Sequence, residues 1–104
     1  MDSKEILRHI GLNEKESLIY LALLEIGEAP VLKISKRAGV KRPTAYLVLH
    51  SLESKGFVSR IEKRRQTLYV PQHPRKILTE AEIRLKEIQD TIPQFEAMMQ
   101  SRKK

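Results

Sequence analysis

Four glycines divide the first 56 residues into short segments that carry apolar side chains at helical spacing. Each glycine follows the last apolar position of its segment, which is where glycine commonly ends a helix. The pattern predicts four short helices around one core, ending at Gly11, Gly27, Gly39 and Gly56.

The second of these helices has the clearest beginning. Asn13 offers an N-cap side chain and Glu16 stands at the third helical position, which is a variant of the capping box. We expect a helix over residues 14–26. It is apolar over much of its circumference, so it is predicted to be the central buried helix.

The third and fourth segments predict a helix-turn-helix. The extended stretch 29–31 breaks the chain before a shorter helix that ends at Gly39. Pro43 suits the first turn of the next helix because its missing N–H is not needed there. The inward stripe of that helix consists of Ala45, Leu49 and Leu52. Two short helices joined by a glycine-containing turn, with the second one basic at its start, are typical of DNA-binding proteins.

Two segments rich in β-branched and aromatic residues follow. Residues 57–62 and 67–71 are predicted strands, joined by the connection 63–66, which holds three cations. Such a tip favours contact with phosphate; the alternative is a solvated turn whose charges discourage edge pairing. The sequence thus predicts a mainly α fold with a small β-hairpin, a winged helix-turn-helix, which we place in residues 1–73.

All of the excess positive charge falls in residues 41–76. This third holds nine Lys and Arg against two Asp and Glu, whereas residues 1–40 hold six of each and residues 77–104 hold five of each; it therefore accounts for the whole net charge of +7. A concentrated basic stripe releases counterions when it meets a phosphate backbone. We therefore expect these cations to converge on one surface shaped for double-stranded DNA.

The last segment, residues 74–104, carries an apolar seam at alternating spacings of three and four, which is typical of a long coiled-coil helix. Folding back onto the body is the alternative. However, burying four seam side chains against a second copy would contribute roughly 6 to 12 kcal/mol per chain. We expect a homodimer, and the seam leaves open whether its two helices run parallel or antiparallel. We expect Pro93 to kink or restart the helix. The predicted dimerisation residues are Leu78, Ala81, Leu85, Ile88, Ile92, Phe95 and Met99.

The outward face of the helix around Pro43 is predicted to enter the major groove. Thr44 can reach a phosphate or a base edge, Tyr46 can lie on thymine methyl groups, and Arg42 can bond guanine. A Tyr46 ring partly buried against the hairpin is an equal alternative, and for His50 the alternative is an ordinary exposed residue. The predicted DNA-binding residues are Lys41, Arg42, Pro43, Thr44, Tyr46, Leu47, His50, Arg60, Lys63, Arg64, Arg65 and Gln66.

The residues of the chain predict no catalytic or metal-binding constellation. His9, His50 and His73 are far apart, and a chain without cysteine has neither a disulfide nor a thiolate zinc site. We therefore predict no enzyme activity, no cofactor and no small-molecule ligand. The charged first residues, and the lack of an apolar run of about 18 residues, predict a cytoplasmic protein without a membrane span.

Residues 10–71 resemble the winged-helix domain of the TrmB family of archaeal and bacterial transcriptional regulators. The segments that carry the resemblance are Gly11–Glu16, Ile19–Leu24, Ala38–Tyr46 and Leu52–Val58. The resemblance implies sequence-specific binding of duplex DNA by a dimer, with the helix after Lys41 in the major groove and the hairpin as a wing on the backbone or minor groove. Larger members continue into a sugar-binding domain, so we do not expect direct sugar sensing here.

These features support three hypotheses about function. The first is a homodimeric, sequence-specific transcription factor that acts as a repressor or autoregulator. The second is an architectural, nucleoid-associated protein that coats or bridges DNA without choosing sequence, and its basic stripe would look the same. The third is a winged helix whose basic face meets an acidic partner or RNA.

Overall fold

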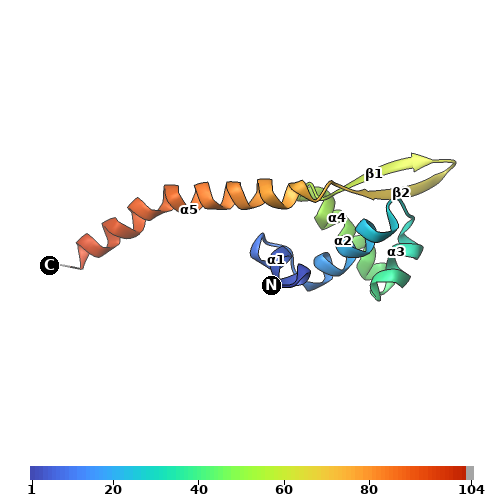
Figure 1. Cartoon of the computed structure of the whole chain (residues 1–104), viewed down its shortest axis with the longest axis horizontal. Helices are drawn as coiled ribbons and strands as arrows, with labels where there is room; N and C mark the ends of the chain where they lie inside the picture. Colours follow the sequence, from blue (N-terminus) through green and yellow to red (C-terminus); the bar gives the residue numbers. More distant parts are fainter. Residues whose placement is uncertain (103–104) are drawn as a thin grey trace.

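Within residues 1–102, which a computed structural model describes, the chain forms five helices and one two-stranded antiparallel sheet (Figure 1). The first four helices and the hairpin form a body from which the last helix extends, and the extents of the molecule are 66 × 25 × 21 Å. The predicted fold class is confirmed. In chain order the elements are α1 (Ser3–His9), α2 (Glu14–Ile26), α3 (Val31–Ala38), α4 (Arg42–Ser54), β1 (Val58–Lys63), β2 (Gln66–Pro71) and α5 (Arg75–Ser101).

The central helix, α2, has the bounds that its caps predict. Asn13 Oδ1 accepts a hydrogen bond from the Glu16 amide at 2.8 Å, and Glu16 Oε1 accepts one from the Asn13 amide at 2.8 Å. Ile19, Tyr20 and Leu23 are fully buried. α2 therefore supplies the surface on which the other helices of the body pack.

Glu16 also ties the start of α2 to the end of α4. Its carboxylate accepts hydrogen bonds from Ser51 Oγ at 2.6 Å and Lys55 Nζ at 2.8 Å, and only 1% of its surface is exposed. Burial alone would raise the pKa of Glu16, but these two bonds and the bond from the Asn13 amide outweigh burial and hold the pKa below its usual value. The carboxylate is therefore ionised at neutral pH and fixes α4 relative to α2.

α3 and α4 form the predicted helix-turn-helix. Gly39 ends α3 in the left-handed region, at φ 69°, and Pro43 lies in the first turn of α4. Across the turn, Ser35 Oγ donates a hydrogen bond to the Val40 carbonyl at 2.5 Å. The predicted inward stripe is fully buried and consists of Ala45, Leu49 and Leu52. The opposite face of α4 is consequently turned away from the core.

The hairpin is tighter than the sequence indicates. β1 extends to Lys63 and β2 begins at Gln66, so Arg64 and Arg65 form the turn. Both arginines lie in the left-handed region, at φ 51° and 62°. A two-residue turn normally places asparagine or glycine there. The predicted four-residue connection is wrong because no residue in this segment signals a left-handed turn.

The base of the hairpin is fixed to the helices on two sides. Ala29 and Tyr69 exchange backbone hydrogen bonds of 3.1 and 2.8 Å. The Phe57 ring packs edge-on against Tyr20 with centroids 5.4 Å apart, and the Tyr20 hydroxyl donates to the Gln72 carbonyl at 3.0 Å. The tip of the hairpin extends beyond the helices (Figure 1).

Beyond its first turns, which pack against the body through Ile77, α5 has no partner element in the described chain. None of its residues is buried, and the exposed fractions of Leu85, Ile88 and Phe95 are 57, 58 and 54%. The helix continues through Pro93, and its axis bends along the last third (Figure 1). The proline thus bends α5 rather than restarting it. The helix outruns the body, as expected from its length, and leaves its seam uncovered.

Candidate nucleic-acid interface

The face of α4 opposite the core is exposed. The exposed fractions of Tyr46 and Leu47 are 46 and 74%, and Arg42, Pro43 and His50 are exposed as well. These five residues were predicted to bind DNA. They give the helix a surface that combines a cation, an aromatic ring, an imidazole and an aliphatic side chain.

A groove of about 500 Å³ separates this helix-turn-helix from the hairpin. Arg42 and Tyr46 line it from α4, and Arg60, Arg65 and Gln66 line it from the hairpin. The fold therefore brings together predicted DNA-binding residues from two segments of the chain on one concave surface. The Tyr46 ring is half-exposed and also borders the groove beside the hairpin. Its environment therefore combines the two predicted alternatives, a ring available to DNA and a ring partly buried near the hairpin.

Another part of the groove wall was missed by sequence reasoning. Pro30 and Leu32 at the start of α3, and Tyr69 on β2, line it too. Burial raises the pKa of Tyr69, so its hydroxyl stays protonated and can donate a hydrogen bond. The Ala29 bridge to Tyr69 brings these residues together. The sequence indicates extended backbone near Pro30 but gives no sign of its partner.

The hairpin tip presents Lys63, Arg64 and Arg65 to solvent. The left-handed backbone of the two arginines costs roughly 1–2 kcal/mol each. Strained residues persist where the surrounding structure holds them, and they cluster at functional sites. Glycine or asparagine would make the same turn with less strain, so the turn geometry does not explain the arginines.

Two cations of this surface have carboxylate neighbours. Arg60 Nε lies 3.5 Å from Glu53 Oε2, and Lys63 Nζ lies 3.6 Å from Glu28 Oε2. Exposed ion pairs of this kind contribute about 0–1 kcal/mol. A phosphate can therefore replace either carboxylate at little cost in free energy.

Lys41 and Thr44 lie on the other flank of α4. They line a separate hollow with Glu14, Lys15 and other residues near the start of α2. Thr44 and Tyr46 consequently face different sides of the helix.

The expectation that all cations between residues 41 and 76 share one surface is wrong for four of them. Lys55 is held by the buried carboxylate of α2 described above. Lys76 lies over the Phe57 ring, 5.9 Å from its centroid, and Arg75 borders a hollow between α1 and α5. Lys41 lies on the other flank of α4, as described above. The basic surface of α4 and the hairpin, called the basic face below, consists of Arg42, Arg60, Lys63, Arg64 and Arg65.

Two features are absent from residues 1–102. In this part of the chain no three His, Asp or Glu side chains are arranged to hold a metal ion. Over the same residues, no helix combines the length and the apolar character that crossing a membrane requires.

A helix-turn-helix followed by a hairpin that packs beside it is the arrangement of winged-helix transcriptional regulators, which bind DNA. Residues 7–75 match the family model described as "Sugar-specific transcriptional regulator TrmB". The match covers more than half of the chain, and the chain belongs to the TrmB family. The resemblance seen in the sequence is thereby confirmed. A comparison with curated proteins found no match.

Solved structures with the same fold include three of particular use. TrmBL2, described as an archaeal chromatin protein with a novel mode of DNA binding, is 28% identical with a TM-score of 0.73; the match covers 93% of this chain and 38% of that one. A possible transcriptional regulator from Methanosarcina mazei Go1 is 11% identical with a TM-score of 0.76; the match covers 94% of this chain and 88% of that one. A MarR family protein from Bacillus stearothermophilus is 19% identical with a TM-score of 0.63; the match covers 95% of this chain and 78% of that one. The last two matches show the fold alone. This chain thus spans little more than a third of TrmBL2.

Proposed function

We propose that the protein is a homodimeric, sequence-specific regulator that inserts α4 into the major groove of duplex DNA. The hairpin then lies as a wing on the backbone or minor groove. The observation that carries this proposal is the groove that joins Arg42 and Tyr46 of α4 to Arg60 and Arg65 of the hairpin. It places cations on both walls of a groove beside the exposed face of α4.

Sequence readout would come from the exposed face of α4. Arg42 at the helix start can bond guanine or a phosphate, and Leu47 and Tyr46 can contact thymine methyl groups. A leucine exposed over 74% of its surface at mid-helix, beside the basic face, fits this role. Phosphate contacts from the hairpin tip would position the protein without choosing sequence.

Dimerisation would come from α5. Its seam remains exposed in the single chain, and a seam of alternating three and four spacings buries itself efficiently against a second helix. Each chain would then present one α4 to one of two half-sites. For two-fold proteins of this class, half-sites lie about 34–36 Å apart.

A sequence-tolerant architectural protein is the second candidate. It is favoured by the 28% identity over 93% of this chain to TrmBL2, which is described as a chromatin protein. The basic face would serve both functions. The difference lies in the affinity gap between the preferred duplex and competitor DNA.

Selection of bound duplexes from a random library, followed by footprinting on the selected sites, tests the proposal. A regulator selects one two-fold related motif and protects a single footprint, with a gap of about 10³-fold or more over random duplex. Continuous protection and no enriched motif would support the architectural function instead. Failure to bind any duplex at low salt would refute both.

A further inference from the structure

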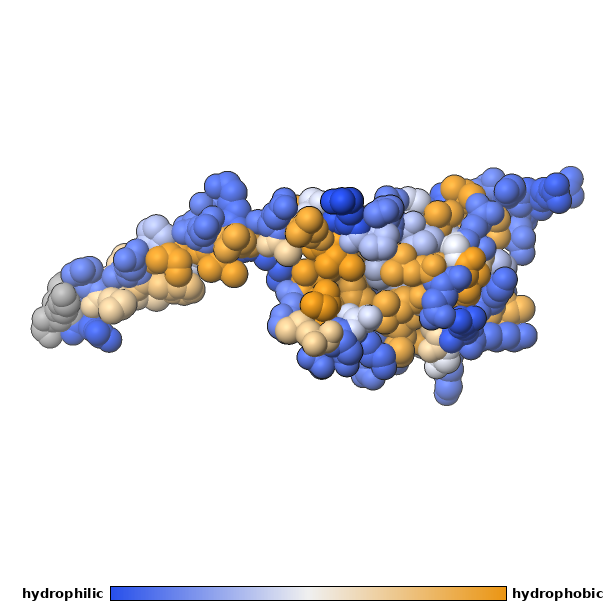
Figure 2. All heavy atoms as spheres, viewed as in Figure 1, coloured by the Kyte–Doolittle hydropathy of each residue, from blue (hydrophilic) through white to orange (hydrophobic). Residues whose placement is uncertain are grey.

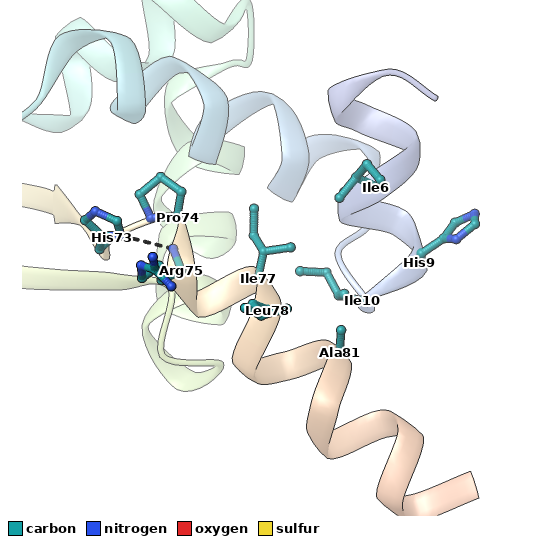
Figure 3. Close-up of a pocket in the computed structure, with 9 residues that line it drawn as sticks. All are labelled: Ile6, His9, Ile10, His73, Pro74, Arg75, Ile77, Leu78 and Ala81. Carbon is teal, nitrogen blue, oxygen red and sulfur yellow. Dashed lines mark hydrogen bonds between the residues drawn. The ribbon is translucent and has the colours of Figure 1, made fainter.

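An open apolar hollow lies where α5 leaves the body. It measures about 630 Å³. Ile6 of α1 and Ile10, which follows that helix, face Ile77, Leu78 and Ala81 of α5 across it (Figure 3). No side chain of residues 1–102 fills this hollow, and it is almost entirely apolar.

The hollow is continuous with the seam of α5. Leu78 and Ala81, which line the hollow, are also the first two positions of the seam. One apolar surface runs from the body along α5 (Figure 2). A second helix laid on the seam therefore reaches the hollow if it runs far enough toward the body.

We propose that two chains pair through α5 in antiparallel orientation, and that the Phe95 end of each α5 fills the hollow of the other chain. This inference rests on the homodimer of the proposed function, and it fixes the orientation and the register that the seam alone leaves open.

The register follows from the spacing of the seam. When Leu85 faces Ile88 of the second copy, Ala81 faces Ile92 and Leu78 faces Phe95. Ala81, the smallest seam residue, then meets Ile92 of the second copy, and Phe95, the largest, enters the hollow. Pro93 lies outside the seam, so its ring does not occupy a contact position.

Flanking charges favour the same register. It sets Arg75, on the rim of the hollow, opposite Glu96 of the second copy, twice in each dimer. Neither side chain takes part in the ion pairs formed within residues 1–102. The proposed pairing gives each of them a partner of opposite charge.

The competing arrangements lack this match. An antiparallel pair shifted by one heptad sets Glu82 opposite Glu96 of the second copy, which is a like-charge contact. A parallel pair sets Arg84 opposite Gln89 and leaves Glu82 opposite an apolar side chain. In a parallel pair, moreover, both hollows stay open, because the Phe95 ends lie together at the far end of the dimer.

The arrangement also separates the two bodies by a useful distance. In this register the starts of the two α5 helices lie about 23 residues apart along the pair, or roughly 35 Å at 1.5 Å per residue. This is the spacing of successive major grooves on one face of DNA. A parallel pair would start both helices side by side, roughly 8–10 Å apart.

Disulfide formation distinguishes the arrangements, because the natural chain has no cysteine. We expect Ala81→Cys and Ile92→Cys chains to form almost no covalent dimer when each is oxidised alone. Refolded together, they should form a mixed disulfide dimer in high yield on a non-reducing gel. In the proposed pair, two copies of residue 81 lie 11 residues apart along the axis, roughly 16 Å, which is beyond the reach of a disulfide.

Each other outcome overturns the inference. Efficient crosslinking of either variant alone indicates parallel helices. Crosslinking of Ala81→Cys with Met99→Cys, in place of Ile92→Cys, indicates the shifted antiparallel register. Both results leave the homodimer standing. A monomer at every concentration in sedimentation, for the natural chain, would instead refute the homodimer of the proposed function.

Charge reversal provides a second test in the chain without cysteine. We expect Arg75→Glu and Glu96→Arg, each alone, to weaken self-association about tenfold in sedimentation equilibrium. The double variant should recover most of the natural affinity, because opposite charges again face each other. Both positions are exposed, so circular dichroism should show natural folding in all variants. Equal self-association of the single variants and the natural chain would refute the register.

Discussion

Because the hairpin turn is strained and basic, one double substitution there should raise the folding stability and lower the DNA affinity. Replacing Arg64 with asparagine and Arg65 with glycine keeps a two-residue turn, since Asn-Gly is strongly preferred where both central residues have positive φ. The structure places both arginines in that region, at φ 51° and 62°. The double variant should therefore fold more stably and bind DNA less well.

The expected stability gain follows from the two backbone conformations. Each arginine costs roughly 1–2 kcal/mol in the left-handed region, and the extra freedom of glycine in the unfolded chain returns part of the gain. We expect a net stabilisation of about 1–2 kcal/mol, which raises the melting temperature by roughly 4–8 °C per kcal/mol for a domain of this size. Thermal unfolding followed by circular dichroism measures this change.

The expected loss of affinity follows from counterion release. Two lost phosphate contacts lower the slope of log affinity against log salt by about 1.8, which corresponds to roughly 60-fold weaker binding at 0.1 M salt. Fluorescence anisotropy on a random duplex, repeated over a salt series, measures both quantities. Lys4→Ala with Lys86→Ala is the matched control, because it removes the same charge from exposed positions on α1 and α5.

Three results would refute the reasoning. Natural affinity and slope in the double variant would mean that the tip does not touch phosphates. Unchanged stability would mean that the arginines do not strain the turn. An equal loss of affinity in the control would trace the effect to net charge rather than to the wing.

Three further predictions follow from other parts of the structure. Glu16→Gln should lower the unfolding free energy at pH 7 by about 1–3 kcal/mol. Because the pKa of Glu16 is lowered in the folded state, the natural chain should lose this extra stability as pH falls below about 4.5. Chemical denaturation of both chains at pH 7 and pH 3 measures the difference. Leu47→Ala should reduce discrimination between selected and random duplex by roughly 1–3 kcal/mol per altered base contact without changing the salt slope, as competition binding would show. If the second copy fills the hollow that α1 lines, Ile6→Lys should weaken self-association about tenfold in sedimentation. Ile83→Lys, on the outer face of α5, is the control and should leave self-association unchanged. Equal effects of the two substitutions would contradict the filled hollow.

The helices could be predicted closely because their ends depend on local chemistry. The Asn13 side chain and the Glu16 carboxylate satisfy amides within four residues, and Gly39 adopts a left-handed conformation that few other residues tolerate. These signals lie within one turn of the boundary they mark. The bounds of α2 therefore match the sequence at both ends.

The hairpin turn and the groove depend on contacts that the sequence does not mark. Arg64 and Arg65 adopt a conformation for which their residue type has no preference, so the turn was predicted two residues too long. The Ala29–Tyr69 bridge joins segments 40 residues apart through one pair of hydrogen bonds, too little to leave a periodic pattern. Lys55 belongs to the basic third by position, yet a carboxylate 39 residues away holds it outside the basic face.

DNA affinity should depend on α5 even though the proposed contacts to DNA all lie in the body. When one body of a dimer binds, the second meets the neighbouring half-site at an effective concentration set by their connection, of millimolar order. Ile88→Glu, which places a charge in the seam, should therefore give a monomer whose salt slope is about half that of the natural dimer, because half the phosphate contacts remain. Ile83→Glu adds the same charge to the outer face of α5 and should keep the natural slope. A monomeric Ile88→Glu chain that retained the full slope would show that pairing through α5 contributes nothing to DNA binding.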